Sequence, residues 1–391
     1  MKNTEKTPEI LLVTRPLTPP WDEASKNFAY LLATKLDQYK FHILVGEYDE
    51  NLPKHITQHV IYKGASWTTL QKTKLVLKLY LLLKKNPGIN TVHFLFAPTP
   101  FNTRVLKNLV RSFPIKVIQT IASVPRNARD KIASALFANQ IVVYSKHAKK
   151  ELLGARGGSS LENKLSVIPP FIDFSQFKFP SQKERMAIRK KWKIQESDKI
   201  ILFPGEYSRL GAIEILLKSF IKIKQNIPEA KLYLACRIKK KEDYKIEHQF
   251  KKEISSLGLS SSVNFLGKVE NIRELYVASD LTVFPAKFME GKSLEGKFDF
   301  PFVLLESLTC GTQIITSDLA ALPEIWEGNK EYLKNYVYPA EKPGVFLTKS
   351  IKILEQDRKM YAKELSTFVN NRFNQAKILE RYSELYNSLV I

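Results

Sequence analysis

Short apolar runs alternate with longer stretches of helical periodicity along the whole chain. Such runs are typical of buried parallel strands, and apolar positions three and four residues apart indicate amphipathic helices. In the first half, the runs predict strands at Ile10–Thr14, Phe41–Val45, Val60–Tyr62, Thr91–Phe96, Lys116–Thr120 and Ile141–Tyr144. The intervening periodicity predicts helices at about Ala24–Leu36, Leu70–Lys85, Phe101–Phe113, Arg126–Ala138 and Lys146–Gly154. This alternation indicates an α/β fold with a doubly wound parallel sheet, which binds ligands beyond the carboxyl ends of its strands.

The second half repeats the pattern after a proline-rich strand exit at Val167–Asp173. Strands are expected at Ile200–Pro204, Lys231–Ala235, Val263–Leu266, Leu281–Pro285 and Gln313–Thr316, and a last helix at about Asn374–Ser388. A chain of 391 residues is long for one hydrophobic core and fits two α/β domains. We therefore predict an N-terminal domain at 1–175, a linker at 176–199, a second domain at 200–370, and a C-terminal helix at 371–391 that returns to the first domain.

The segment from Leu281 to Trp326 reads as strand, loop, helix, strand. A polar loop follows the strand, and Pro301 stands where the first helical position is expected, since its fixed φ suits that place. Cys310 and Gly311 supply the helix stop. This order of elements places a helix N-terminus at the carboxyl edge of the sheet, where its N–H groups and partial positive charge accept phosphate.

Two charged residues in this segment are candidates for ligand binding. Lys297, just before the helix, is a mobile cation, and Glu306, about one and a half turns in, could accept hydrogen bonds from sugar hydroxyls. The plain alternative is an ordinary α/β unit whose helix carries one solvated glutamate. The fit of strand, loop length, helix start and following strand favours the functional interpretation.

Two further turns contain glycines at strand ends. Gly205 and Gly211 follow the first strand of the second domain, where backbone N–H groups can approach a phosphate closely. Arg209 is the cation of this turn, and the sequence leaves open whether it binds a ligand or lies on the surface of a tight turn. Gly267 follows the strand at Val263–Leu266 in a similar way.

These segments resemble the donor site of the family 4 retaining glycosyltransferases, which have the GT-B fold of two doubly wound Rossmann-like domains facing across a cleft. Val303–Gly311 matches the second half of the family's motif, including the second glutamate at Glu306. The first glutamate of that motif would fall at Phe298, which is flanked by Lys297 and Asp299. The chain is thus similar to a variant subgroup with a Lys-x-Asp-x-Pro start.

The resemblance implies retaining transfer of a hexosyl group from a nucleoside diphosphate sugar to an acceptor. In that reaction Asp299 and Glu306 would be the catalytic carboxylates, on the sugar hydroxyls and the ribose respectively. The donor-binding set would be Gly205, Arg209, Gly267, Lys297, Phe302 and Val303, the last two through their backbone amides. The nucleotide sugar is then a co-substrate, and no cofactor is expected. A metal is not implied either, because no Asp-x-Asp pair follows a strand.

Positive charge is concentrated in residues 51–150 of the first domain. The net charge is +22, and residues 51–150 carry 17 Lys and Arg against the single acid Asp130, a local net charge of +16. A field of this sign attracts polyanions. We expect a glycan or lipid-linked acceptor and an anionic membrane surface as partners of residues 51–150, in which the helix at Leu70–Lys85 alternates leucine with lysine. The phosphate-rich alternative, nucleic acid, lacks a recognised binding motif.

A nucleotide-sugar epimerase of the same fold is the second enzymatic alternative. It would need acid and base groups in the first domain, and the scarcity of acids there argues against it. His93 is expected to be a core histidine within a strand, and His55 and His59 are expected in a polar loop. Cys236 and Cys310 are expected to be buried thiols of a reducing compartment. With no signal peptide in the charged N-terminus, we expect a cytoplasmic protein, either free or peripheral on the inner face of the membrane.

Overall fold

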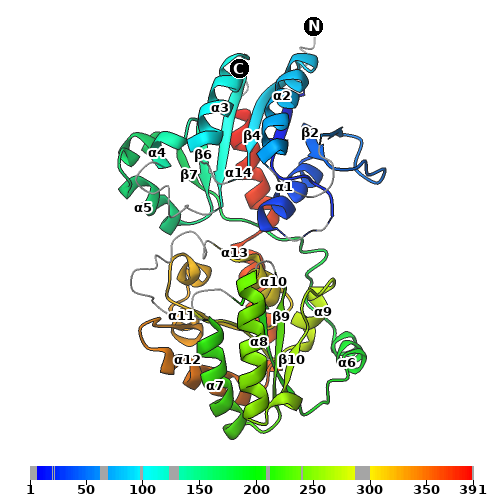
Figure 1. Cartoon of the computed structure of the whole chain (residues 1–391), viewed down its shortest axis with the longest axis vertical. Coiled ribbons are helices and arrows are strands. Elements are labelled where there is room, and N and C mark those ends of the chain that lie inside the picture. The colour runs from blue at the N-terminus through cyan, green and yellow to red at the C-terminus, as the bar shows by residue number, and fades with distance from the viewer. Residues whose placement is uncertain are drawn as a thin grey trace. The chain divides into compact units, whose positions relative to one another are not determined.

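The computed structural model describes residues 7–19, 21, 23–61, 69–96, 100–122, 132–207, 212–238, 241–286 and 300–389 (Figure 1). The chain divides into two compact units. Unit 1 holds Met1–Phe171 and Gln375–Ile391, and unit 2 holds Ile172–Leu294 and Phe300–Asn374. Each unit contains one parallel sheet, as the alternation of apolar runs and helical periodicity predicted.

The sheet of unit 1 has the strand order β3-β2-β1-β4-β5-β6-β7. Its strands are β1 (Glu9–Val13), β2 (Lys40–Val45), β3 (Ile56–Val60), β4 (Ile89–Phe94), β5 (Lys116–Ile121), β6 (Gln140–Val143) and β7 (Leu165–Val167). The third strand lies earlier than the predicted Val60–Tyr62. Parallel pairing with β2 explains the shift, because the register joins Phe41 to Ile56 and Val45 to Val60.

Helices cover both faces of this sheet. They are α1 (Ala24–Lys35), α2 (Thr69–Lys85), α3 (Pro100–Arg111), α4 (Ile132–Ala135), α5 (Lys146–Gly154) and α14 (Gln375–Asn387), with the 3-10 helix η2 (Gly158–Lys164). Buried side chains of α2, α3 and α5 join those of the strands in one hydrophobic cluster. Right-handed crossovers place α2 and α3 on the same face, since β3→β4 and β4→β5 run in the same direction across the sheet.

The C-terminal helix α14 packs with the N-terminal part of the chain in unit 1. The ring of Tyr382 lies 5.6 Å from that of Phe28 on α1. His93 on β4 lies with Nδ1 2.8 Å from Tyr386 Oη and Nε2 2.7 Å from Thr120 Oγ1. Complete burial lowers the pKa of His93 to about 3, so the imidazole is neutral. The expectation of a core histidine is confirmed.

The expectation of a polar loop around His59 is wrong. His59 is part of β3, and its ring stacks on that of His42 on β2, with His42 Nδ1 2.9 Å from His59 Nε2. His42 Nε2 in turn lies 3.0 Å from Glu9 Oε2. Burial, and then the neighbouring His42, lower the pKa of His59 to about 4. The cross-strand partner, which sequence spacing does not reveal, sets this arrangement.

The sheet of unit 2 has the order β10-β9-β8-β11-β12-β13. Its strands are β8 (Lys199–Gly205), β9 (Ala230–Cys236), β10 (Val263–Phe265), β11 (Leu281–Phe284), β12 (Gln313–Ser317) and β13 (Val337–Tyr338). Its helices are α6 (Gln182–Lys191), α7 (Ala212–Asn226), α8 (Lys241–Ser256), α9 (Ile272–Ala278), α10 (Phe302–Thr309), α11 (Lys330–Tyr336), α12 (Pro343–Glu355) and α13 (Lys359–Arg372), with η3 (Ser260–Ser262) and η4 (Leu322–Trp326). The thiols of Cys236 and Cys310 are buried, as expected, and form no disulfide within the described residues.

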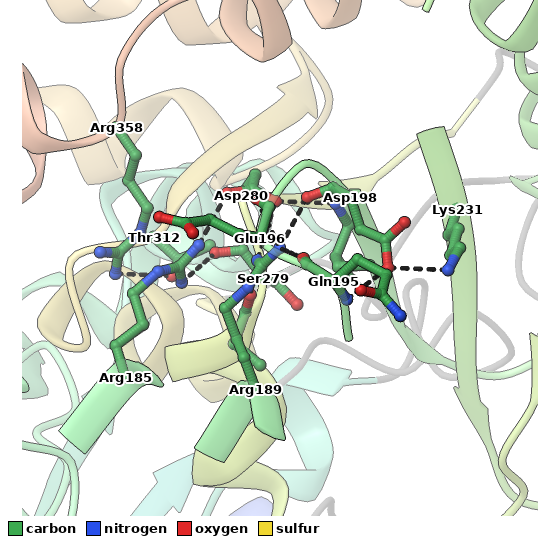
Figure 2. Close-up of polar contacts among 12 residues, drawn as sticks. Arg185, Arg189, Gln195, Glu196, Asp198, Lys231, Ser279, Asp280, Thr312 and Arg358 are labelled. Atoms are coloured by element: carbon green, nitrogen blue, oxygen red, sulfur yellow. Dashed lines mark hydrogen bonds and ion pairs between the residues drawn. The ribbon is translucent and has the colours of Figure 1, made fainter. Parts of the chain in front are cut away.

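Helix α6 lies within the 176–199 segment for which a linker was predicted, and two of its arginines fasten it to the amino edge of the sheet (Figure 2). Arg185 and Arg189, one helical turn apart, both pair with Asp280, at 2.7 and 3.4 Å. Asp280 also accepts the backbone N–H of Ile200 at 2.7 Å. Arg189 donates to the Asp198 carbonyl at 2.7 Å. Because Asp198 and Asp280 directly precede β8 and β11, this network joins the starts of two strands to α6.

Within the described residues, no helix has the length and apolar character needed to cross a membrane.

Candidate functional site

The order of strands in unit 2 identifies the edge at which a ligand should bind. From β8 the chain runs to β9 and β10 on one side, and from β11 to β12 and β13 on the other. β8 and β11 are neighbours, paired in parallel through Ile201 and Leu281. The connections after these two strands therefore leave the sheet in opposite directions. Such a switch point leaves a crevice at the carboxyl ends, where doubly wound sheets bind their ligands.

Helix α10 begins at this edge. Its buried residues Leu304, Leu305 and Leu308 hold it on the sheet, and Ser307 Oγ donates a 2.8 Å hydrogen bond to Thr282 Oγ1 on β11. Pro301 is the N-cap, with φ −62° and ψ 118°, rather than the predicted first helical residue. The chain enters the helix one residue later because Pro301 keeps an extended ψ.

The first turn of α10 is the part of the site that an anion would meet. The first four N–H groups of an α-helix have no acceptor within the helix, and they carry a partial positive charge. The amides of Phe302 and Val303 lie in this turn. The Pro301 carbonyl accepts the amide of Leu304 at 3.0 Å and so closes the turn. The geometry suits a phosphate placed at the helix axis.

Phe300 has a backbone conformation that is rare for a bulky residue. Its φ of +44° lies in the left-handed region, which costs an L side chain roughly 1–2 kcal/mol. The ring is 3% exposed and contacts Phe373 edge to face, with the centroids 5.4 Å apart. Burial of this ring offsets the strain and fixes the chain immediately before α10. Strained residues of this kind cluster at functional sites.

Glu306 is not the solvated helix-face carboxylate that the plain alternative assumed. Tyr276 on α9, fully buried, donates its hydroxyl to Glu306 Oε2 at 3.0 Å. Burial raises the pKa of Glu306 to about 7, and the Tyr276 hydrogen bond counteracts part of that rise. A carboxyl group poised near neutral pH beside a ligand edge is a functional-site candidate. The sequence does not reveal Tyr276 as the partner of Glu306, since no local pattern pairs α9 with α10.

Gly205 and Gly267, the two glycines of the predicted donor set, are needed at their positions for different physical reasons. Gly267 has φ +64°, and a Cβ there would meet nothing within 4 Å, so the turn needs glycine for its backbone conformation. A Cβ on Gly205 would lie 2.9 Å from the ring of Phe203. Packing of Phe203 is therefore sufficient to account for Gly205. The role of either glycine in donor binding stays a prediction.

Polar groups at the carboxyl ends of β11 and β12 add to this edge. Tyr338 on β13 is fully buried and donates to the Ala286 carbonyl at 2.7 Å, while its oxygen accepts the Ala286 amide at 2.8 Å. This pair of bonds holds the chain where it leaves β11. On β12, the buried hydroxyls of Thr316 and Ser317 have no hydrogen-bond partner within the described part of the chain. Buried polar atoms are usually paired, so these two hydroxyls suit a site that a polar ligand completes.

Three residues of the predicted site, Arg209, Lys297 and Asp299, lie outside the described residues. Glu306 lies in α10 itself, just after the first turn, and Gly205 ends β8, the strand that pairs with β11 at the switch point. Across the described ranges, no three His, Cys, Asp or Glu side chains gather as they would around a metal ion.

Comparison with known families agrees with this geometry. Residues 184–371 match the family of glycosyl transferases group 1. The group 1 match begins in α6 and ends in α13, so it spans both sides of the switch point and all of α10. It also includes Arg185 and Arg189 of α6.

Individual relatives extend the comparison. N-acetyl-alpha-D-glucosaminyl L-malate synthase of Bacillus anthracis is 25% identical over 214 residues, which is 52% of this chain and 49% of that protein. The chain spans about half the length, or less, of the curated relatives it matches.

Solved structures match over nearly the full length. A glycosyltransferase from Rickettsia africae has a TM-score of 0.74 at 16% identity, covering 98% of both chains. Anabaena HepE, solved with UDP and glucose, has a TM-score of 0.72 at 16% identity, covering 98% of this chain and 100% of that one. These likenesses confirm the predicted fold class, GT-B with two Rossmann-like α/β units.

Proposed function

We propose that this protein is a retaining glycosyltransferase that moves a hexosyl group from a nucleoside diphosphate sugar to a glycan or lipid-linked acceptor. The observation that carries the proposal is the N-terminus of α10 at the switch point of a sheet whose chain matches the glycosyl transferases group 1 family. HepE, which shares the fold, has been solved with UDP and glucose. The family match favours transfer over epimerisation or nucleic-acid binding.

The diphosphate would lie at the first turn of α10. As the bond between the sugar and the diphosphate breaks, negative charge grows on the leaving phosphate, and the amides of Phe302 and Val303 stabilise it through hydrogen bonds and the helix dipole. Lys297 and Arg209 would supply the cations. Lys297 takes over from a cation that the resembled family carries on the facing turn, in the variant Lys-x-Asp-x-Pro subgroup.

The two carboxylates would act on the donor as a pair. Glu306 would accept hydrogen bonds from the ribose and Asp299 from the transferred sugar. In the unliganded protein, desolvation by burial holds the pKa of Glu306 at about 7. A bound hydroxyl donating to this carboxylate would favour its charged form and lower its pKa again. Donor binding and ionisation of Glu306 would then be coupled, so donor affinity should rise with pH through about 7.

A thermal-shift panel of UDP-, GDP- and ADP-sugars tests the donor class, with CMP-sugars as the monophosphate control. A ligand at 100 times its Kd adds ~2.7 kcal/mol to the unfolding free energy. Lys297→Ala and Arg209→Ala should each weaken nucleoside diphosphate binding by ~1.5–3 kcal/mol, the range for hydrogen bonds to charged groups. Lys218→Ala, an exposed lysine on α7, is the matched control and should leave binding unchanged.

The outcome separates the alternatives. Equal losses for nucleoside and nucleoside diphosphate would show that Lys297 and Arg209 do not bind the diphosphate. NMR of the product gives the anomeric configuration, and inversion would refute the retaining mechanism. Conversion of the nucleotide sugar to its epimer without any acceptor would replace the transferase by an epimerase.

A further inference from the structure

The outer surface of α2 carries large apolar side chains that are exposed to solvent. Leu77 is 63% exposed, Tyr80 41% and Leu81 45%. These positions are three and four residues apart, so they lie side by side on one helical face. Single exposed apolar residues are normal on a protein surface, but three on one face of a helix form a patch.

The same helix also has a complete inner face. Leu75, Leu79, Leu82 and Leu83 are buried in the hydrophobic cluster of unit 1. These four leucines form the core-facing side of α2, and among the three exposed residues the ring of Tyr80 also contacts that of Phe113, with the centroids 5.5 Å apart. The alternation of leucine and lysine in the sequence resolves into two faces, one that packs on the sheet and one that faces solvent.

Lysines surround the exposed patch. Lys74, Lys78, Lys84 and Lys85 are all exposed on α2. The next helix, α3, packs against α2 on the same face of the sheet. Its outer side carries Arg104, Lys107 and Arg111, which lie one helical turn apart.

The segment that contains α2 and α3 supplies no acid of its own to offset these charges. Between residues 51 and 129 the chain contains no Asp or Glu. The α3 cations also line a hollow of about 340 Å³ together with Asn108, whose side-chain amide can donate to a phosphate. The surface thus combines apolar side chains, cations and a polar hollow.

We propose that the outer faces of α2 and α3 dock unit 1 on an anionic membrane, with Leu77, Tyr80 and Leu81 entering the headgroup region. Apolar residues on one face flanked by lysine are the signature of a helix that lies in the membrane interface. Each basic residue near an anionic surface strengthens binding about fivefold. Binding to nucleic acid would explain the cations but not the exposed leucines. Binding to a protein partner would not explain the absence of acids from this segment. This docking surface lies wholly in unit 1 and is independent of the donor chemistry proposed for unit 2.

Vesicle flotation of the full chain tests it, without nucleotide sugar. Wild type should float with vesicles of phosphatidylcholine and phosphatidylglycerol, remain behind with pure phosphatidylcholine, and be released at 1 M salt, where screening shortens to ~3 Å. Lys74→Gln, Lys78→Gln and Lys84→Gln together should weaken binding about a hundredfold. Leu77→Ser with Leu81→Ser should weaken it as well, and should remove most of the binding that resists moderate salt.

The matched control carries the same charge change elsewhere. Lys218→Gln, Lys245→Gln and Lys252→Gln alter exposed lysines on α7 and α8 of unit 2 and should keep flotation at the wild-type level. Circular dichroism verifies that each variant is folded, and the nucleotide-sugar thermal shift reports on unit 2 separately. A positive thermal shift without flotation would overturn the membrane proposal alone.

Equal recovery on neutral and anionic vesicles, or equal loss in the control variant, would also overturn it. Tight binding to RNA with no flotation would replace the membrane by a nucleic acid.

Discussion

Replacing Glu306 by glutamine should stabilise the fold while it impairs catalysis. Burial raises the pKa of Glu306 from 4.5 to about 7. The folded protein therefore favours the neutral carboxyl group, and ionisation above pH 7 opposes folding. Glutamine has nearly the same shape, carries no charge, and retains an oxygen that can accept the hydroxyl of Tyr276.

The magnitude follows from the size of the shift. A rise from 4.5 to about 7 corresponds to ~3 kcal/mol, at 1.36 kcal/mol per pKa unit. At pH 8 the glutamate is ionised in both the folded and the unfolded state, so Glu306→Gln should recover most of this amount. At pH 4 the carboxyl is largely neutral in both states, and the gain should vanish. For a unit of 150–250 residues, ~3 kcal/mol corresponds to roughly 6–12 °C in Tm.

Urea unfolding at pH 8 and pH 4 measures the effect, with Glu355→Gln as the control. Glu355 is exposed at the end of α12, and its substitution should change stability by less than about 0.5 kcal/mol. Tyr276→Phe supplies an internal check. It removes the hydrogen bond that favours the charged carboxylate, so the gain from Glu306→Gln should be larger in that background.

Two results would refute the reasoning. A Glu306→Gln variant that is equally stable or less stable at pH 8 would mean that the carboxylate is well accommodated as a charge. Unchanged turnover in the same variant would remove Glu306 from the donor site, whatever its effect on stability.

The remaining predictions concern other parts of the chain. Asp280→Asn leaves the buried Arg189 and the partly buried Arg185 without their carboxylate and should cost ~3–5 kcal/mol by urea unfolding, whereas Lys191→Gln, which breaks an exposed ion pair, should cost under ~1 kcal/mol. His59, with a pKa lowered to about 4, folds in its neutral form, so stability should fall as the pH drops from about 6.5 towards 4, and His59→Gln should flatten that slope. Gly267→Ala places a side chain at φ +64° and should cost ~1 kcal/mol of stability, with a larger loss in donor affinity if the turn contacts the nucleotide.

The local pattern of the chain was enough to predict most of the elements. Strands such as Phe41–Val45 were recognisable because apolar runs bounded by polar turns carry their own signal. Gly311, with φ +73°, ends the helix of the candidate site as predicted. The order of strand, loop and helix around Pro301 also predicted which edge of the sheet would hold an anion, because parallel strands place all such loops at one edge.

Packing between distant segments decided the rest. Tyr276 meets Glu306 across two helices, and Arg189 reaches Asp280 across 91 residues of chain. No local period encodes these contacts, which arise only when the elements pack. They decide whether a carboxylate is solvated or poised near neutral pH, and whether a polar segment is a linker or part of a domain.

Helix α2 shows most directly which features the sequence predicts and which depend on tertiary packing. Its sequence predicted a helix and a strong positive charge, but it contains too many leucines to reveal which of them face the core. Only contact with the sheet separates buried Leu79 from exposed Leu77. Helix formation depends on neighbours within a few residues along the chain, whereas the buried face depends on the strands underneath, so the first could be predicted from the sequence and the second required the tertiary structure.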